Sequence, residues 1–219
     1  MNIVFNEDCM EVMKRYPDGY FDIAIVDPVY GDVPKGGYMN GTGGGLVKQK
    51  DYHAAIWQQE KTGPEYFKEL FRVSKNQIIW GGNYFVEAIG RNSPCWIVWD
   101  KDHPEGVNYA DCELAWTSFP TAARLFKYRW NGFIQQNMKN REVRIHPTQK
   151  PTDLYRWIYR TFKIPRGSKV IDTHLGSGTH RRAAYDFDMD FVGCEIEKIY
   201  YDLQENAYQE YTAQIRLEI

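Results

Sequence analysis

The sequence lacks several features that would assign a protein to a class at once. It has only four cysteines (Cys9, Cys95, Cys112 and Cys194), and no two of them form a CxxC pair. This spacing argues against a zinc site and a disulfide framework, so we expect no metal and reduced thiols. No hydrophobic run approaches the roughly 18 residues of a membrane-spanning helix. The first residues turn acidic without an apolar stretch, so we predict a cytoplasmic protein that does not interact with membranes.

The charge is nearly balanced, and the net value of −2 does not indicate a nucleic-acid-binding protein. The basic residues are nevertheless concentrated between positions 124 and 150, where Glu142 is the single acid. Clustered positive charge is typical of a surface that contacts phosphates, although solvated basic side chains explain it equally well. The candidates for phosphate contact in this segment are Arg124, Lys127, Arg129, Lys139, Arg141 and Arg144.

Strand-like apolar runs alternate with helical segments, which predicts an α/β domain with a mostly parallel sheet. We expect strands over 2–5, 23–26, 77–80, 96–99, 113–117, 169–172 and 191–195. We expect helices over 10–15, 64–73 and 151–162, and from about residues 179 and 197 onward. Residues 31–63 lack periodicity and are rich in glycine, so we predict a mobile loop there. The basic Lys35 in this loop is a further candidate for contact with nucleic acid.

A glycine turn follows the strand predicted over 169–172 and precedes a helix. Gly176 and Gly178 would let the backbone approach a ligand closely, and the helix start offers free N–H donors. Two glycines at this spacing are weak evidence by themselves. Glu195, at the end of the next strand, lies where Rossmann-type sheets place an acid that binds ribose hydroxyls. This unit indicates a site for an adenosine-containing cofactor, with a purely structural turn and a surface acid as the alternative.

A second turn follows the strand predicted over 23–26 and contains Asp27, Pro28 and Tyr30. Proline fixes the backbone and donates no hydrogen bond, so the turn can present a carboxylate and a carbonyl side by side. Two acceptors suit an amino group, which has two hydrogens to donate. The Tyr30 ring offers a face on which a flipped base can stack. In isolation, an ordinary turn with a packed tyrosine would be the simpler interpretation.

Together these motifs resemble the amino-methyltransferases that form N6-methyladenine or N4-methylcytosine in DNA, in the group whose catalytic motif precedes its cofactor motif. The matches occur in the family's order and span nearly the whole chain. Asp-Pro-Val-Tyr at 27–30 matches DPPY, and HPTQKP at 146–151 is complete. Asp-Thr-His-Leu-Gly-Ser-Gly-Thr at 172–179 matches D-P-F-x-G-S-G-T. The chain departs from the pattern at Val29, Thr173 and His174, and the last two alter an aromatic contact that the family makes to the cofactor's adenine.

The resemblance implies a Rossmann-like, S-adenosylmethionine-dependent methyltransferase of a bacterial or phage-infected cell, with a twisted sheet containing one antiparallel strand and helices on both faces. It implies double-stranded DNA as substrate and, because it covers nearly the whole chain, a single domain over 1–219 without a separate target-recognition domain. The small size of the chain favours a short target or a homodimer, since one subunit offers little surface to span a long site. Asp27, Pro28 and Tyr30 would be catalytic. The implied cofactor-binding residues are Asp8, His146, Thr148, Gln149, Lys150, Asp172, Thr173, His174, Leu175, Gly176, Ser177, Gly178, Thr179 and Glu195.

Asp rather than Ser before the proline favours adenine N6 as the methylated atom. An N4-cytosine enzyme is the close alternative, and a non-catalytic DNA-binding relative is a second one because of Val29, Thr173 and His174. A methyltransferase for small molecules or proteins fits the glycine turn but not the two other motifs. Asn83, which follows the strand predicted over 77–80, is a further candidate for contact with the base or the DNA backbone.

Overall fold

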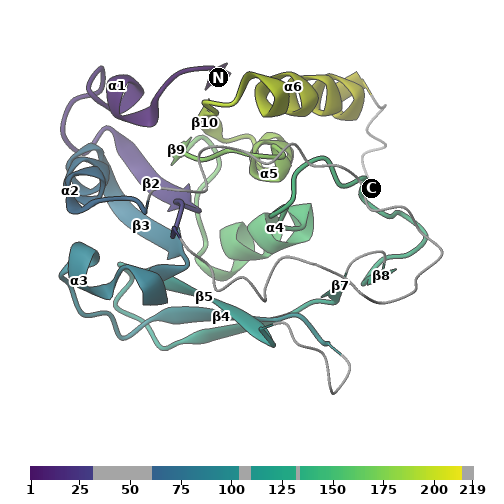
Figure 1. Cartoon of the computed structure of the whole chain (residues 1–219), viewed down its shortest axis with the longest axis horizontal. Helices are drawn as coiled ribbons and strands as arrows, with labels where there is room; N and C mark the ends of the chain where they lie inside the picture. The colour runs from purple at the N-terminus through teal and green to yellow at the C-terminus, as the bar shows by residue number, and fades with distance from the viewer. Residues whose placement is uncertain (32–60, 104–109, 132–133, 214–219) are drawn as a thin grey trace.

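The computed structural model describes residues 1–31, 61–103, 110–131 and 134–213. Its first half contains β1 (Asn2–Phe5), α1 (Cys9–Met13), β2 (Phe21–Val26), α2 (Pro64–Val73), β3 (Ser74–Trp80), the 3-10 turn η2 (Gly82–Tyr84), α3 (Val86–Ile89), β4 (Trp96–Asp100) and β5 (Cys112–Thr117). Its second half contains β6 (Arg124–Lys127), β7 (Trp130–Asn131), β8 (Ile134–Gln135), α4 (Thr152–Thr161), β9 (Lys169–Asp172), α5 (Thr179–Asp186), β10 (Asp190–Cys194) and α6 (Lys198–Ala213) (Figure 1).

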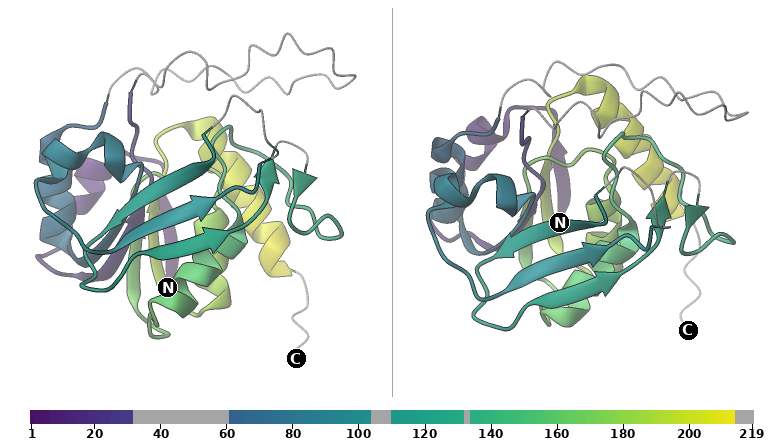
Figure 2. Two further views of the ribbon diagram at one scale, coloured as in Figure 1. Left: turned by 90° about the horizontal axis from the view of Figure 1, so that it is seen from below. Right: turned by 60° about the horizontal axis from the view of Figure 1, so that its bottom comes forward.

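Eight strands form one sheet in the order β1-β10-β9-β2-β3-β5-β4-β6. Strand β5 runs antiparallel to both of its neighbours, and the other pairs are parallel. The sheet is twisted, as the changing strand direction in Figure 2 shows. This confirms the predicted α/β fold with a mostly parallel sheet and one antiparallel strand.

The strand order reverses direction between β9 and β2, which pair in parallel through Ile23–Val170 and Ala24–Ile171. From β9 the chain crosses to β10 on one side, whereas from β2 it crosses to β3 on the other. Open α/β sheets bind ligands in the crevice outside the carboxyl ends of the strands at such a reversal. The predicted catalytic and cofactor turns follow these two strands, so the topology brings them to the same edge.

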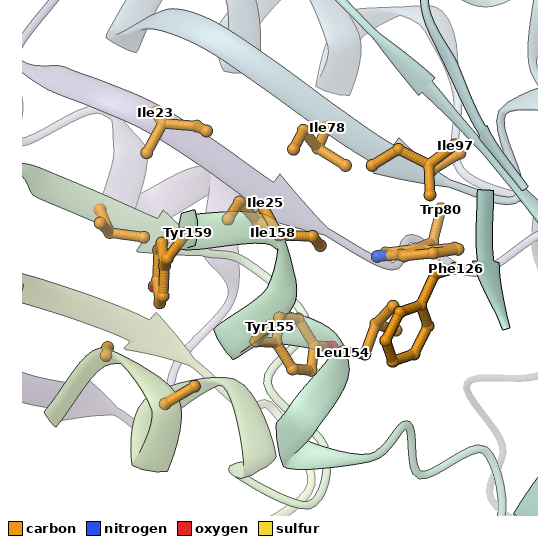
Figure 3. Close-up of a cluster of buried hydrophobic side chains, with 14 of the residues drawn as sticks. Ile23, Ile25, Ile78, Trp80, Ile97, Phe126, Leu154, Tyr155, Ile158 and Tyr159 are labelled. Carbon is orange, nitrogen blue, oxygen red and sulfur yellow. The ribbon is translucent and has the colours of Figure 1, made fainter. Parts of the chain in front are cut away.

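Two hydrophobic cores cover the two faces of the sheet because alternate side chains of a strand point in opposite directions. Ile23 and Ile25 of β2 face α4, where they pack with residues of β3, β4 and β6 (Figure 3). Ala24 and Val26 face α1 and α2. Helices α4–α6 and α1–α3 accordingly lie on opposite sides of the sheet (Figure 1), which confirms the prediction of helices on both faces.

The helices form where the sequence pattern predicts them. Pro64 begins α2 at the predicted residue, and Tyr66, Phe67, Leu70 and Val73 bury one of its faces. Short elements escaped prediction: β6, β7, β8, η2 and α3 are each four residues or fewer, too short for a periodic signal. The loop predicted over 31–63, with Lys35, lies mostly outside the described residues. Within those residues, no helix is long and apolar enough to cross a membrane.

Candidate active site

A pocket opens at the carboxyl edge of the sheet, beside the reversal between β9 and β2. Most of the residues predicted to bind a cofactor line it: Asp8, His146, Thr148, Gln149, Lys150, Thr173, His174, Leu175, Gly176, Ser177, Thr179 and Glu195. Asp27 and Val29 contribute from the end of β2. The structure therefore brings together five segments of the chain, the first at Asp8 and the last at Glu195.

The glycine turn forms the floor of this pocket. Gly176 and Gly178 have φ values of +55° and +70°, a region that glycine adopts without strain. A Cβ on Gly178 would lie 3.0 Å from the Cβ of Gln204 in α6, so the turn also packs closely against that helix. Helix α5 begins immediately afterwards at Thr179. Gly178 and Asp172 support the turn without lining the pocket.

Glu195 closes the pocket from the end of β10. Its two carboxylate oxygens accept the backbone N–H groups of Gly176 at 2.8 Å and Glu197 at 2.9 Å. Burial raises its pKa to about 7, although both backbone hydrogen bonds oppose this shift. Asp8, on the opposite side, caps α1 by accepting the Met10 N–H at 2.7 Å. Both acids are thus held in place by backbone groups.

Asp172, at the end of β9, is held by a buried histidine that sequence analysis did not single out. His180 Nδ1 lies 2.8 Å from one Asp172 carboxylate oxygen, and the other accepts the His174 N–H at 3.1 Å. The far nitrogen of His180 pairs with the Tyr159 hydroxyl at 2.8 Å, and Tyr155 stacks on its ring. Because all of these groups are buried, Asp172 orients the turn from beneath.

Thr173 and His174, which depart from the family pattern, form one hydrogen-bonded chain. The Thr173 hydroxyl lies 2.5 Å from the Tyr66 hydroxyl and 2.9 Å from His174 Nδ1. The Tyr66 ring also packs edge-on against His174, with ring centres 5.3 Å apart. Burial lowers the pKa of His174 to about 4, so its ring is neutral near pH 7. The two substitutions are therefore accommodated together by a tyrosine from α2.

The catalytic candidate Asp27 has two partners. Its Oδ2 accepts a hydrogen bond from Lys150 Nζ at 2.5 Å, and its Oδ1 accepts one from the Tyr30 hydroxyl at 3.3 Å. The resemblance assigned Lys150 to the cofactor, and the structure adds a contact with the carboxylate of Asp27. Lys150 Nζ also lies 3.1 Å from Glu113 on β5, a residue that sequence analysis missed.

Tyr30 lies against a turn that leaves no room for a side chain. Gly81 has a φ of +65°, and a Cβ there would lie 2.4 Å from the Tyr30 ring. Tyr84, 46% exposed, stacks on Tyr30 with ring centres 4.9 Å apart. Asn83 is exposed in the same η2 turn. The residues after β3 thus pack against the predicted base-stacking ring.

The HPTQK segment is a folded wall of the pocket. Gln149 holds it together, because its side chain accepts the Ile145 N–H at 2.9 Å and donates to the Val143 carbonyl at 3.2 Å. His146 lies edge-on to Tyr200, and burial together with Lys150 lowers its pKa to about 3. His146 therefore presents a neutral ring over Gly176.

The predicted basic surface separates into two groups. Lys127 and Arg129 form ion pairs with Asp102, and the Arg144 guanidinium packs over Trp130. Arg124, Lys139 and Arg141 are exposed. Lys127 and Arg129 are exposed as well, so the two groups differ in that Lys127, Arg129 and Arg144 contact other side chains of the protein.

Comparisons with known proteins show which family and which fold this chain resembles. A family model described as DNA methylase, of N6/N4 methyltransferases, matches residues 46–206. The type II methyltransferase M.HinfI of Haemophilus influenzae is 23% identical, over 96% of this chain and 69% of its own. The M1.HpyAVI–SAM complex superposes with a TM-score of 0.58 at 20% identity, covering 94% of this chain and 100% of that one. The cytosine-N4-specific PvuII DNA methyltransferase superposes with a TM-score of 0.58 at 11% identity, and the match covers 97% of this chain and 92% of that one.

Proposed function

The chain belongs to the DNA methylase family, and from that premise we propose that it transfers a methyl group from S-adenosylmethionine to adenine N6 of double-stranded DNA. The observation that carries this proposal is the position of the Asp27 carboxylate. It lies at the end of β2, on the wall of a pocket whose floor is the glycine turn at 176–178. An amine held by Asp27 would thus meet a ligand bound over that turn.

The pocket residues suit S-adenosylmethionine at both ends of that molecule. Glu195 would accept the ribose hydroxyls, and Asp8 would accept the adenine amino group. The neutral His146 and the Thr148–Lys150 segment would enclose the methionine part. Asp172 would act from beneath through His174 and the turn rather than by direct contact, because its carboxylate is buried and does not line the pocket.

In the proposed reaction, the Tyr30 ring stacks on the flipped base while Asp27 and the Pro28 carbonyl accept the two amino hydrogens. These bonds direct the nitrogen lone pair toward the methyl carbon. S-adenosylmethionine would supply the methyl group when bound over the glycine turn. A nitrogen–carbon bond would form as the carbon–sulfur bond breaks, with the electron pair of that bond retained on sulfur as a thioether. The methylated nitrogen would then release one proton to water. Positioning and electrostatics supply the acceleration, and no covalent enzyme intermediate is needed.

Asp at position 27 supports adenine over cytosine, while the likeness to a cytosine-N4-specific enzyme keeps that base as the second candidate. The hydrogen-bonded accommodation of Thr173 and His174 supports an active protein over a degenerate one. We further propose that the chain acts as a single methyltransferase domain on a short recognition sequence, alone or as a homodimer on DNA.

The test is transfer of tritiated methyl groups to unmethylated DNA, followed by mass spectrometry of the nucleosides and sequencing of the modified positions. N6-methyladenine as the product supports the proposal. N4-methylcytosine as the product would show that the target base is cytosine instead of adenine. Asp27→Asn, which keeps the shape of the side chain, serves as the control. Full activity in this variant would refute the catalytic assignment.

A further inference from the structure

Four charged side chains of alternating sign extend outward from Asp27. Lys150 Nζ lies 2.5 Å from Asp27 and 3.1 Å from Glu113, and Glu113 in turn lies 2.5 Å from Lys101 Nζ. The Lys150 side chain is only 3% exposed, and its ammonium lies 5.4 Å from the centre of the Trp80 ring. Lys150 is therefore a buried cation shared by two carboxylates.

The sheet topology places Glu113 at this edge. Strand β5 is antiparallel to β3, with Ala115 opposite Trp80, so its N-terminal end reaches the carboxyl edge of the parallel strands. Glu113 lies two residues before Ala115 and therefore points to the same face as Trp80. Lys101 follows β4, whose Trp99 pairs with Glu113. The four charges thus come from β2, β4, β5 and the segment before α4.

A lysine paired with Asp27 alone would oppose the proposed reaction in two ways. It would occupy an acceptor that the incoming amine needs, and its ammonium would repel a nitrogen that becomes positive. In a buried site both effects are stronger than in water. A second carboxylate on Lys150 offsets its charge and offers its hydrogens another acceptor.

We propose that Glu113 is a positioning residue of the methyl transfer, which holds Lys150 so that Asp27 can accept the hydrogen of the target amine in an electrically neutral site. This inference rests on the proposed function and extends it to a residue outside the family motifs. Glu113 acts through Lys150 and Asp27 and does not itself contact the substrate.

The pKa shifts of Asp27 and Glu113 agree with a Lys150 ammonium that both carboxylates share. Burial raises the pKa of Asp27, Lys150 opposes that shift, and Glu113 adds to it. Burial also opposes the charge of Glu113, yet Lys150 and Lys101 lower its pKa to about 2. The other titratable groups that face this set are Asp172 from β9, Tyr155 from α4, Tyr30 and His146.

The activity test compares Glu113→Gln, Lys150→Met and the double variant in steady-state methylation of DNA. We expect Glu113→Gln to lower kcat about tenfold with an unchanged Kd for S-adenosylmethionine. Glu113→Gln should partly rescue Lys150→Met, because the double variant is again neutral. Glu69→Gln, which alters a distant pair with Arg72, is the matched control. If the fold-loss in kcat of the double variant equals the product of the two single losses, the two residues act independently and the inference is overturned.

A second measurement needs no activity and separates this inference from the proposed function. Carbon-13 NMR of labelled aspartate carboxyls, with Asp27→Asn for assignment, gives the titration of Asp27 in the free protein. Glu113→Gln should move that titration to lower pH, because a neighbouring negative charge is lost. An unchanged titration would overturn the inference. Absence of methyl transfer by the unaltered protein would instead overturn the proposed function.

Discussion

The Glu195 carboxylate accepts the Gly176 N–H at 2.8 Å, which ties the end of β10 to the glycine turn after β9. This bond uses one oxygen of a buried acid whose pKa lies near neutrality. Each carboxylate oxygen has two lone pairs, so Glu195 can hold the turn and accept ribose hydroxyls at once. The ligand site and the fold are joined at this residue.

Affinity for the adenosine part of the cofactor should rise with pH through Glu195. Burial raises the pKa of this group to about 7, so below pH 7 it is largely protonated in the free protein. Ribose hydroxyls donate to the ionised form, so binding is favoured above that value. We expect methylthioadenosine, which lacks the titrating amino acid, to bind roughly tenfold more tightly at pH 8 than at pH 6. Calorimetry measures this. A pH-independent Kd, or the same slope in Glu195→Gln, would contradict it.

His174 should carry its proton on Nε2. Burial raises the pKa of Tyr66, whose hydroxyl stays protonated and can donate to Thr173 Oγ1. Thr173 then donates to His174 Nδ1. Nitrogen-15 NMR of the ring should show this tautomer, and Thr173→Val should alter it.

The same substitution at Thr173 tests the role of His174 in the pocket. Losing one hydrogen bond of about 1 kcal/mol should weaken S-adenosylmethionine binding about fivefold. Thr117→Val, which removes a hydroxyl bonded to the Cys95 carbonyl elsewhere in the sheet, is the control. A proton on Nδ1 of His174 in the unaltered protein would refute the proposed order of donors, from Tyr66 to Thr173 to His174.

Gly81→Ala should displace Tyr30. A Cβ at this position would lie 2.4 Å from the ring, and the φ of +65° adds backbone strain. We expect a loss of about 1–3 kcal/mol in the free energy of unfolding and strongly reduced methylation. Gly90→Ala carries similar strain at φ +60° but meets its nearest atom at 3.7 Å. Urea unfolding gives the folded fraction of each variant, and methylation is then compared per amount of folded protein. If both variants methylate DNA equally well, the packing of Tyr30 has no catalytic role.

Arg124 and Arg141 should contribute more to DNA binding than basic residues that form ion pairs within the protein. Arg124→Ala and Arg141→Ala should each lower affinity, and each should reduce the slope of log K against log salt by about 0.9 if one phosphate contact is lost. Lys127→Ala should have a smaller effect because Lys127 is already paired with Asp102. Fluorescence anisotropy with a DNA duplex at several salt concentrations provides the slopes. If the slopes of Arg124→Ala and Arg141→Ala equal that of the unaltered protein, the DNA binds to another surface.

Local motifs were sufficient to predict many of the residues that line the pocket at the carboxyl edge of the sheet. Asp27 and the glycine turn each follow a strand with a buried apolar pattern, and the carboxyl ends of parallel strands meet at one edge. Glu195 was predictable for the same reason. The helix bounds of α2 followed from Pro64 and from apolar spacing. These signals lie within a few residues of each other, so they can be read without knowing the fold.

The sequence by itself determined the alternation of strands and helices, the two turns that we propose carry the chemistry, and the order of the motifs. Only the tertiary structure decided which side chains complete the site: His180 beneath Asp172, Tyr66 beside Thr173, and Glu113 on Lys150. The physical reason is that these contacts depend on strand order, direction and packing between elements distant in the chain. Glu113 reaches Lys150, and through it Asp27, because β5 runs antiparallel to its neighbours.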